Sequence, residues 1–334
     1  MKLLEVKNLK TTFHIDAGDV FAVRNTSFHV DRGESLGIVG ESGSGKSVSM
    51  QSVVRLLPDN ATVEADSIMF DGVELLKADE KYMRKIHGSD IGMIFQDPMT
   101  SLNPLFTIGD QLIEPIRIHQ KVSKAEAREK AVEMLKLVEI PSAESRLKQY
   151  PHEFSGGMRQ RVMIAIAICC NPKLLIADEP TTALDVTIQA QILDLMRGLK
   201  SKINTSIIMI THDLGVIANM CNRIIVMYGG TIVEEGTTRE IFYESRHPYT
   251  WGLLKSIPKV GKGAKRKLIP IPGSPIDLLQ YQPGCPFTAR CDYAMKVCEQ
   301  YKPARIGISD THSASCWLMH AKAPVTIREV AQNE

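Results

Sequence analysis

Residues 40–47, with the sequence GESGSGKS, constrain the fold of this chain more than any other stretch. They fit the pattern G-x-x-x-x-G-K-[ST] of a phosphate-binding loop. The preceding ESLGIVG predicts a short buried strand, and the following KSVSMQSVVRLL has the apolar spacing of a helix. A strand, a glycine-rich turn and a helix in this order direct backbone N–H groups and the positive end of a helix toward phosphate oxygens.

Each residue type in this loop has a physical role. Glycines tolerate the backbone angles that turn N–H groups inward. The Lys46 ammonium would neutralise charge on the β- and γ-phosphates, and the Ser47 hydroxyl would ligate Mg²⁺. The residues expected to hold ATP here are those of the loop and of the helix start: Gly40, Ser42, Gly43, Gly45, Lys46, Ser47 and Val48.

A second motif, LLIADEP at residues 174–180, places two acids directly after an apolar run. The run predicts a buried strand, and Asp178 at its end can hold Mg²⁺ through a water molecule. Glu179 can polarise the attacking water or accept its proton. In a chain that also has a phosphate loop, the two acids indicate nucleotide hydrolysis rather than a solvated turn.

The order of the predicted elements indicates an α/β fold. Residues 1–30 alternate in two strand patterns, and PKLLIADEP and TSIIMITHD predict further buried strands. Residues 124–138, KAEAREKAVEMLKLV, predict an amphipathic helix with Ser123 as its start signal. Strands that alternate with helices imply a parallel sheet.

Composition excludes several classes of protein. The chain of 334 residues is 44% hydrophobic and 23% charged, which is an ordinary globular balance. A net charge of +2 provides no electrostatic basis for a nucleic-acid partner, so none is expected. No run reaches ~18 apolar residues, and MKLLEVKNLK lacks the apolar run of a secretory signal. The cytoplasm, where disulfides are rare, is the expected compartment.

The segment FSGGMRQR resembles the signature sequence of ABC-family ATPases, and further motifs of that family follow in its order. Gln96 in GMIFQDP resembles the Q-loop glutamine, Asp185 in TALD the D-loop aspartate, and His212 in MITHD the switch histidine. Phe13 stands where that family places an aromatic ring against adenine. The resemblance implies that Asp185 and Phe13 contribute to nucleotide binding.

The same resemblance implies the catalytic set. Glu179, His212 and Gln96 would act in hydrolysis, and Gln96 would join Ser47 and Asp178 at the Mg²⁺ ion. Each of these residues by itself has an ordinary structural explanation. Their order along the chain and their flanking motifs favour the functional interpretation.

The signature also predicts an assembly. Ser155, Gly156 and Gly157 precede a helix expected to begin at Met158, and such a helix start is an anion site. In ABC ATPases two nucleotide domains meet head to tail, so that each signature faces the ATP on the other domain's phosphate loop. Met158 departs from the glutamine common at that position, while the serine and glycines that contact phosphate are present.

The implied fold is a P-loop NTPase core, of α/β class, with an antiparallel β subdomain and a helical subdomain at about residues 97–160. The ATPase domain is expected at residues 1–255. Residues 256–334 would form a linker, PKVGKGAKRKLIPIPGSP, and a small cysteine-containing metal-binding extension. This extension is expected to be separate from the nucleotide core.

Three further stretches resemble the ATPases of dipeptide, oligopeptide and nickel importers: QDPMTSLNPLFTIGDQL, RHPYTWGLLKSIP and IPGSPIDLLQYQPGCPFTARC. The resemblance is to the D-type subunit. It implies a second, F-type ATPase subunit, two membrane-spanning permease subunits and an extracellular peptide-binding protein, with this chain peripheral at the cytoplasmic face of the membrane. Import of nickel or another solute stays open. A soluble ABC ATPase is disfavoured, because such proteins usually carry two cassettes or a long coiled-coil insertion.

Four of the seven cysteines cluster near the C-terminus, at Cys285, Cys291, Cys298 and Cys316. Short C-x₂₋₄-C pairs, which are usual in zinc sites, are absent from this cluster. Four thiolates at wider spacing suit an iron–sulfur cluster, and some D-type subunits hold a [4Fe–4S] cluster there. Zinc and free thiols remain the alternatives. A bound metal would supply folding free energy to this polar, proline-rich segment.

Overall fold

The computed structural model describes residues 1–182, 184–203, 205–257, 270–279 and 282–323, which form two compact units. Most of the expected linker, residues 258–269, falls outside this described part. Among the described residues, no helix has the length and apolar character that crossing a membrane requires. Unit 1 comprises Met1–Leu3, Val30–Ser35 and Asp71–Ile210, and unit 2 comprises Leu4–His29, Leu36–Phe70 and Thr211–Glu334.

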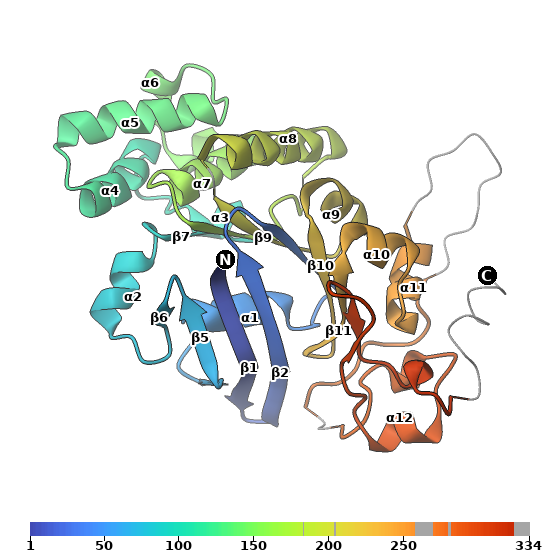
Figure 1. The fold of residues 1–334 in the computed structure, drawn as a ribbon. Helices are drawn as coiled ribbons and strands as arrows, with labels where there is room; N and C mark the ends of the chain where they lie inside the picture. Colours follow the sequence, from blue (N-terminus) through green and yellow to red (C-terminus); the bar gives the residue numbers. More distant parts are fainter. Residues whose placement is uncertain (183, 204, 258–269, 280–281, 324–334) are drawn as a thin grey trace, which may run out of the picture. The chain divides into compact units, whose positions relative to one another are not determined.

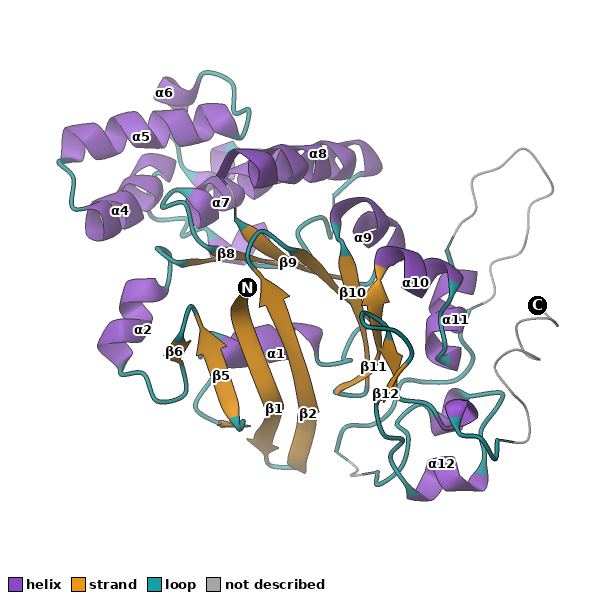
Figure 2. Cartoon of the chain, viewed as in Figure 1, coloured by secondary structure: helices purple, strands orange, loops and turns teal. Residues whose placement is uncertain are grey.

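The centre of unit 1 is a set of parallel strands (Figure 2). β8 pairs in parallel with β7 on one side and with β9 on the other. Every residue of β8 and β9 is buried, which explains their unbroken apolar sequences. The elements of unit 1 are β6 (Val73–Glu74), α2 (Glu80–Ile86), β7 (Ile91–Ile94), α3 (Pro98–Ser101), α4 (Ile108–Gln120), α5 (Lys124–Leu137), α6 (Ala143–Arg146), η1 (Pro151–Glu153), α7 (Gly156–Ile168), β8 (Leu174–Asp178), α8 (Val186–Ile203) and β9 (Ser206–Thr211).

The interval from α3 to α7 is helical, and α4, α5 and α7 pack against one another (Figure 1). Local chemistry sets where these helices begin. Ser123 caps α5, and the side chain of Glu126 accepts a hydrogen bond from the Ser123 N–H, so the expected start signal is confirmed. α7 begins at Gly156, two residues before the expected start, because Ser155 is its N-cap.

Unit 2 contains an antiparallel and a mixed set of strands. β1 pairs antiparallel with β4 and β5, which confirms the expected antiparallel β subdomain. β10 pairs in parallel with β3 and antiparallel with β11. Its elements are β1 (Lys2–Ile15), β2 (Gly18–Asp31), β3 (Ser35–Val39), α1 (Lys46–Val53), β4 (Ala61–Glu64), β5 (Ser67–Phe70), α9 (Leu214–Met220), β10 (Arg223–Tyr228), β11 (Thr231–Thr237), α10 (Thr238–Tyr243), α11 (Pro248–Lys255), η2 (Thr288–Arg290), α12 (Lys296–Gln300), β12 (Ile306–Gly307), β13 (Ser313–Ala314) and η3 (Trp317–Met319).

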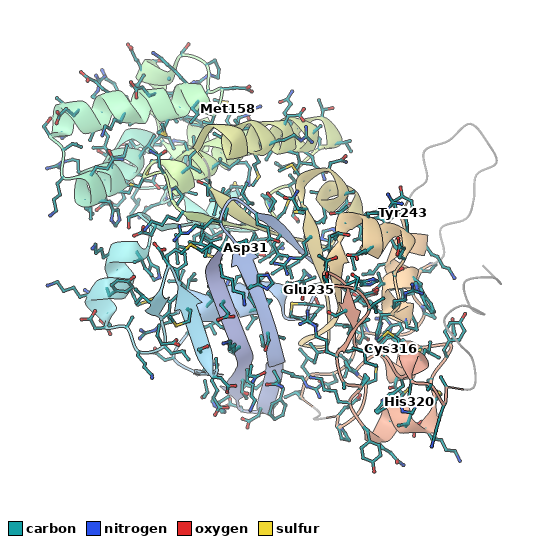
Figure 3. All side chains as sticks on the ribbon, in the orientation of Figure 1. Asp31, Met158, Glu235, Tyr243, Cys316 and His320 are labelled. Carbon is teal, nitrogen blue, oxygen red and sulfur yellow. The ribbon has the colours of Figure 1, made fainter. Side chains whose placement is uncertain are left out.

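The C-terminal extension, residues 270–323 of the described chain, packs directly on the rest of unit 2. β13 adds to the edge of β11, where Ser313 lies opposite Glu235, the residue labelled in Figure 3. Phe287 is buried, and its ring centroid lies 5.2 Å from both the Tyr228 and the Tyr249 centroids. The expectation that the extension is separate from the nucleotide core is therefore wrong, because strand pairing and an aromatic cluster join the two.

Candidate functional site

The phosphate loop of unit 2 has the backbone that its sequence predicts. It joins the buried strand β3 to α1, and Gly43 and Gly45 have φ angles of 77° and 94°. Gly45 occupies the N-cap position of α1, where a positive φ lets the chain turn directly into the helix. Ser42 and Gly43 are exposed, and Ser47 and Val48 are half-buried, so the crest of the loop is open to a ligand.

Backbone from two other strands presses against this loop. A Cβ added to Gly45 would lie 2.4 Å from the carbonyl oxygen of Ala22 in β2. On the other side, Gly230 in the turn between β10 and β11 donates its N–H to the carbonyl oxygen of Ser44 at 3.1 Å. A Cβ on Gly40 would lie 2.2 Å from the carbonyl oxygen of Met227. Glycine is thus required by close backbone approach as well as by φ.

Lys46 is buried, and its ammonium is held over the loop. Its Nζ donates to the carbonyl oxygens of Gly40 and Glu41, both at 2.9 Å. The charge therefore lies at the centre of the turn, with its donors directed to loop backbone. A phosphate group that enters the loop can accept these donors in place of the carbonyl oxygens.

In unit 1 the structure brings together the two acids and the glutamine. Asp178 is the last residue of β8 and is buried, whereas Glu179 follows it in the left-handed region with a φ of 47°. Gln96, which follows β7, donates from Nε2 to Glu179 Oε2 at 3.2 Å. The adjacent strands β7 and β8 therefore deliver both side chains to the same edge of the sheet.

Two residues that the sequence analysis did not single out hold this acidic turn. The Thr182 hydroxyl donates to Glu179 Oε2 at 2.8 Å, and Gln160 Nε2 donates to the carbonyl oxygen of Pro180 at 2.6 Å. Thr182 could have been found from its spacing, because a hydroxyl three residues after an acid commonly bonds back to it. Gln160 could not, because its partner is distant in the sequence.

The signature residues of unit 1 form an open helix start. Ser155 Oγ accepts the N–H of Met158 at 3.4 Å, and both Ser155 and Gly156 are exposed. Asp185 is also exposed and accepts the Ile188 N–H at 2.9 Å. A Cβ on Gly157 would lie 2.7 Å from a methyl carbon of Ile188, so the two motifs pack against each other.

His212 and Phe13 belong to unit 2 and are described separately. His212 follows β9 directly and is exposed, as a histidine that acts on a ligand must be. Phe13 lies in β1 opposite Ala61 of β4 and is half-buried, so its ring is not part of the core. These positions are compatible with the predicted roles of both residues, which stay predictions.

The four C-terminal cysteines come together. Cys285, Cys291, Cys298 and Cys316 line one small cavity, the cysteine cavity, although up to 31 positions separate them in the chain. The Cys285 N–H donates to the carbonyl oxygen of Cys298 at 2.7 Å, which joins the two ends of the segment 285–298. Burial raises the pKa of Cys291 and of Cys316 to about 12. Over the described residues, no group of three or more His, Cys, Asp or Glu side chains has the arrangement of a metal site.

His247 also lines the cysteine cavity. Its Nδ1 accepts the N–H of Tyr249 at 3.1 Å and so caps α11. Burial lowers the pKa of His247 to about 3, so the ring is neutral and its proton must be on Nε2. This Nε2 is buried and has no hydrogen-bond partner among the described residues. The sequence RHPYT contained a signal for this helix start, because proline is favoured at the first helical position, directly after the capping residue.

A phosphate loop, an acid pair after a buried strand and an exposed serine–glycine helix start define a nucleotide-binding ATPase of the P-loop class. A family model described as ABC transporter matches residues 23–182, and one described as oligopeptide/dipeptide transporter, C-terminal region, matches residues 233–298. The chain belongs to the family of ABC transporter ATP-binding proteins named for oligopeptide and dipeptide transport.

Curated relatives support this family over nearly the full length. The oligopeptide transport ATP-binding protein OppD of Bacillus subtilis is 55% identical over 97% of this chain and 90% of its own. The dipeptide transport ATP-binding protein DppD of Lactococcus lactis is 51% identical over 97% and 93%. Among solved structures, the dimeric ATP-binding cassette MJ0796 bound to ADP and Pi matches with a TM-score of 0.64 and 29% identity, over 71% of this chain and 99% of that one.

Replacing Gly45 by Ala should remove ATP binding, because a Cβ there would overlap the carbonyl oxygen of Ala22 and force the loop to shift. Gly72 is the matched control, since it has a similar positive φ of 83° and open space around its Cβ position. Gly72→Ala should cost only about 1–2 kcal/mol of stability and leave ATP affinity unchanged. Calorimetric titration with ATP and thermal unfolding of both variants check this. Normal ATP affinity in Gly45→Ala would contradict the close approach.

Proposed function

We propose that this chain is the ATP-hydrolysing subunit of a membrane importer for dipeptides or oligopeptides and works at the cytoplasmic face of the membrane. The observation that carries the proposal is similarity to peptide-transport ATP-binding proteins along nearly the whole chain, with a C-terminal match specific to oligopeptide and dipeptide transporters. The ATPase core alone would fit many cargoes.

In the proposed mechanism, Lys46 and the loop N–H groups would bind the β- and γ-phosphates. Ser47, Asp178 and Gln96 are the residues that would hold Mg²⁺, which would neutralise phosphate charge. Glu179 polarises the attacking water. Its hydrogen bonds from Gln96 and Thr182 support this role, because they fix the orientation of the carboxylate that would meet the water. His212 would stabilise charge on the transferred phosphate.

The signature supports a head-to-tail pair of ATPase subunits. Ser155 and Gly156 are exposed and present a helix N-terminus, which favours an anion brought by another molecule. A dimer is known for the similar cassette MJ0796. We assign the partner as an F-type ATPase subunit, so that ATP would be bound between two different chains.

The surface around residues 99–106 fits a permease contact. Met99, Leu105 and Phe106 are 61%, 81% and 53% exposed, which is unusual for large apolar side chains. Phe106 also lines a surface groove with Arg117 and Ile118 of α4. An apolar rim next to a groove suits a short helix from one membrane-spanning subunit. The transporter would contain two such subunits, and an extracellular peptide-binding protein would supply them with cargo.

We also propose that the cysteine cavity holds a [4Fe–4S] cluster. Four thiols on one cavity provide the complete ligand set, and a buried Nε2–H of His247 suits an anionic sulfur inside it. Such a cluster supplies one-electron chemistry or structural cross-linking. The residues would need to move closer on ligation, because they do not form a metal site as described. Zinc on the same four cysteines is the alternative outcome.

The function is tested by uptake of a labelled tripeptide into proteoliposomes that contain the complete transporter. Wild type should import the peptide with ATP, and Glu179→Gln should reduce uptake and phosphate release about 10²- to 10⁴-fold while ATP binding persists. Glu129→Gln, an exposed carboxylate of α5, is the matched control and should behave as wild type. The proposed cargo would be contradicted if nickel ions inhibited uptake of the labelled tripeptide and unlabelled peptides did not.

Ser155→Arg tests the head-to-tail assembly. The bulky cation should block the ATP on the partner's phosphate loop more than the ATP on this chain's own loop. Ser123→Arg removes another helix N-cap of similar worth, about 0.5–2 kcal/mol, and should affect neither site. Photo-labelling of the two ATPase subunits with an azido-ATP checks this. Loss of label only at the mutated chain's own loop would rule out the arrangement.

The cluster is tested by single Cys→Ser changes at the four cavity positions in protein purified without oxygen. Each change should remove the metal, because a neutral hydroxyl is a poor substitute for thiolate. Cys221→Ser, a buried thiol elsewhere in unit 2, is the control and should retain it. Iron, sulfide and zinc analysis with visible absorption is the measurement. Full metal retention in two or more of the four variants, or wild type without metal, would refute the site.

A further inference from the structure

Arg290, the last residue of η2 in the C-terminal extension, reaches the phosphate loop. Arg290 is 8% exposed, and its guanidinium binds the Glu41 carboxylate with two parallel hydrogen bonds, Nη1 to Oε2 at 2.5 Å and Nη2 to Oε1 at 3.0 Å. Glu41 is the second residue of the loop, directly after Gly40. Arg290 thus forms a bidentate ion pair with a phosphate-loop residue that lies 249 positions away in the sequence.

Every donor of the Arg290 guanidinium has an acceptor. Besides Glu41, Nε donates to the carbonyl oxygen of Pro272 at 2.8 Å, Nη2 to that of Ile271 at 3.2 Å, and Nη1 to the Tyr228 hydroxyl at 3.3 Å. The Arg290 guanidinium also lies 5.8 Å from the centroid of the Tyr228 ring. Because a guanidinium has five N–H donors and these bonds use five, its orientation is fixed.

Glu41 creates an electrostatic problem that this arrangement solves. A carboxylate in a phosphate loop repels the nucleotide's negative charge and can attract the lysine that should neutralise it. Lys46 Nζ lies 2.9 Å from the Glu41 backbone oxygen, so the lysine charge sits against the residue that carries this carboxylate. With both carboxylate oxygens bound to Arg290, the charge of Glu41 is compensated and directed away from Lys46.

We propose that Arg290 is a positioning residue of the nucleotide site: it holds the Glu41 carboxylate away from Lys46 and from the phosphates of ATP. The C-terminal extension then completes the ATP site of its own chain. Tyr249 assists, since its hydroxyl accepts the Glu41 N–H at 2.7 Å and holds the backbone of the same residue. Arg290 acts on ATP only through Glu41.

The test is equilibrium ATP binding to the full chain by calorimetry. Arg290→Gln should weaken binding about tenfold, because it leaves the carboxylate near the phosphates without its cation. The double variant Glu41→Gln/Arg290→Gln should recover to within about threefold of wild type, because neither charge is present. Arg290→Lys, which keeps the charge without the planar fork, should be intermediate.

Arg305→Gln is the matched control. Arg305 is another arginine of the extension that binds a carboxylate of unit 2, that of Glu235, and it also donates to the carbonyl oxygen of Ser27. These partners lie outside the phosphate loop. The Arg305→Gln change should leave ATP affinity unchanged, although it also removes an arginine–carboxylate pair between the extension and the rest of unit 2.

A purely structural role for the Arg290–Glu41 pair predicts a different pattern. If the pair only fastens the extension, Glu41→Gln alone should weaken ATP binding as much as Arg290→Gln does. If Arg290 compensates the charge of Glu41, the Glu41→Gln variant should bind ATP about threefold more tightly, because the Arg290 cation remains while the Glu41 carboxylate is gone. This single variant decides the matter even if Arg290→Gln fails to fold.

Two results would overturn the proposal: equal losses in Arg290→Gln and in the double variant, or unchanged affinity in Arg290→Gln. Metal content is measured in the same samples, since Arg290 adjoins Cys291. Loss of metal from Arg290→Gln together with equally weak ATP binding in Cys291→Ser would assign the effect to the cysteine cavity instead. The binding assay requires neither peptide transport nor a partner subunit, so its outcome is independent of the proposed cargo.

Discussion

The phosphate loop imposes the constraint on which much of unit 2 depends. Its N–H groups can face one point only if the backbone enters conformations that favour glycine, and the neighbouring strands then approach closely at the positions without side chains. Ala22 of β2 and Gly230 after β10 touch the loop from different sides. The loop is therefore held by backbone contacts, and its one acidic side chain has to be neutralised from elsewhere, which Arg290 does.

In unit 1 a comparable constraint acts on Glu179. Its left-handed backbone, with a φ of 47°, turns the side chain out of the sheet directly after the buried Asp178. Such a backbone is costly for a residue other than glycine, and it persists because Gln96 and Thr182 bond the carboxylate. Gln96 also begins the stretch that exposes Met99 and Phe106.

The C-terminal extension has more contacts with the rest of unit 2 than its composition indicates. Its polar, proline-rich sequence predicts a segment that needs a metal to fold. The structure adds contacts that composition does not indicate: β13 pairs with β11, Phe287 packs between two tyrosines, and Arg290 and Arg305 bind carboxylates outside the extension. These contacts hold the extension in addition to any ligation at the cysteine cavity.

The sequence by itself determined the local elements and the chemistry of each motif. The strand before the loop, the capped helix that starts after Ser123 and the acids after β8 all follow from short-range patterns whose physics lies within a few residues. The tertiary structure alone decided which distant groups meet. Nothing near Glu41 in the sequence predicts Arg290, and nothing near His247 predicts that four cysteines line the same cavity. Such pairings depend on long-range packing of β10, β11 and the extension, which local periodicity does not encode.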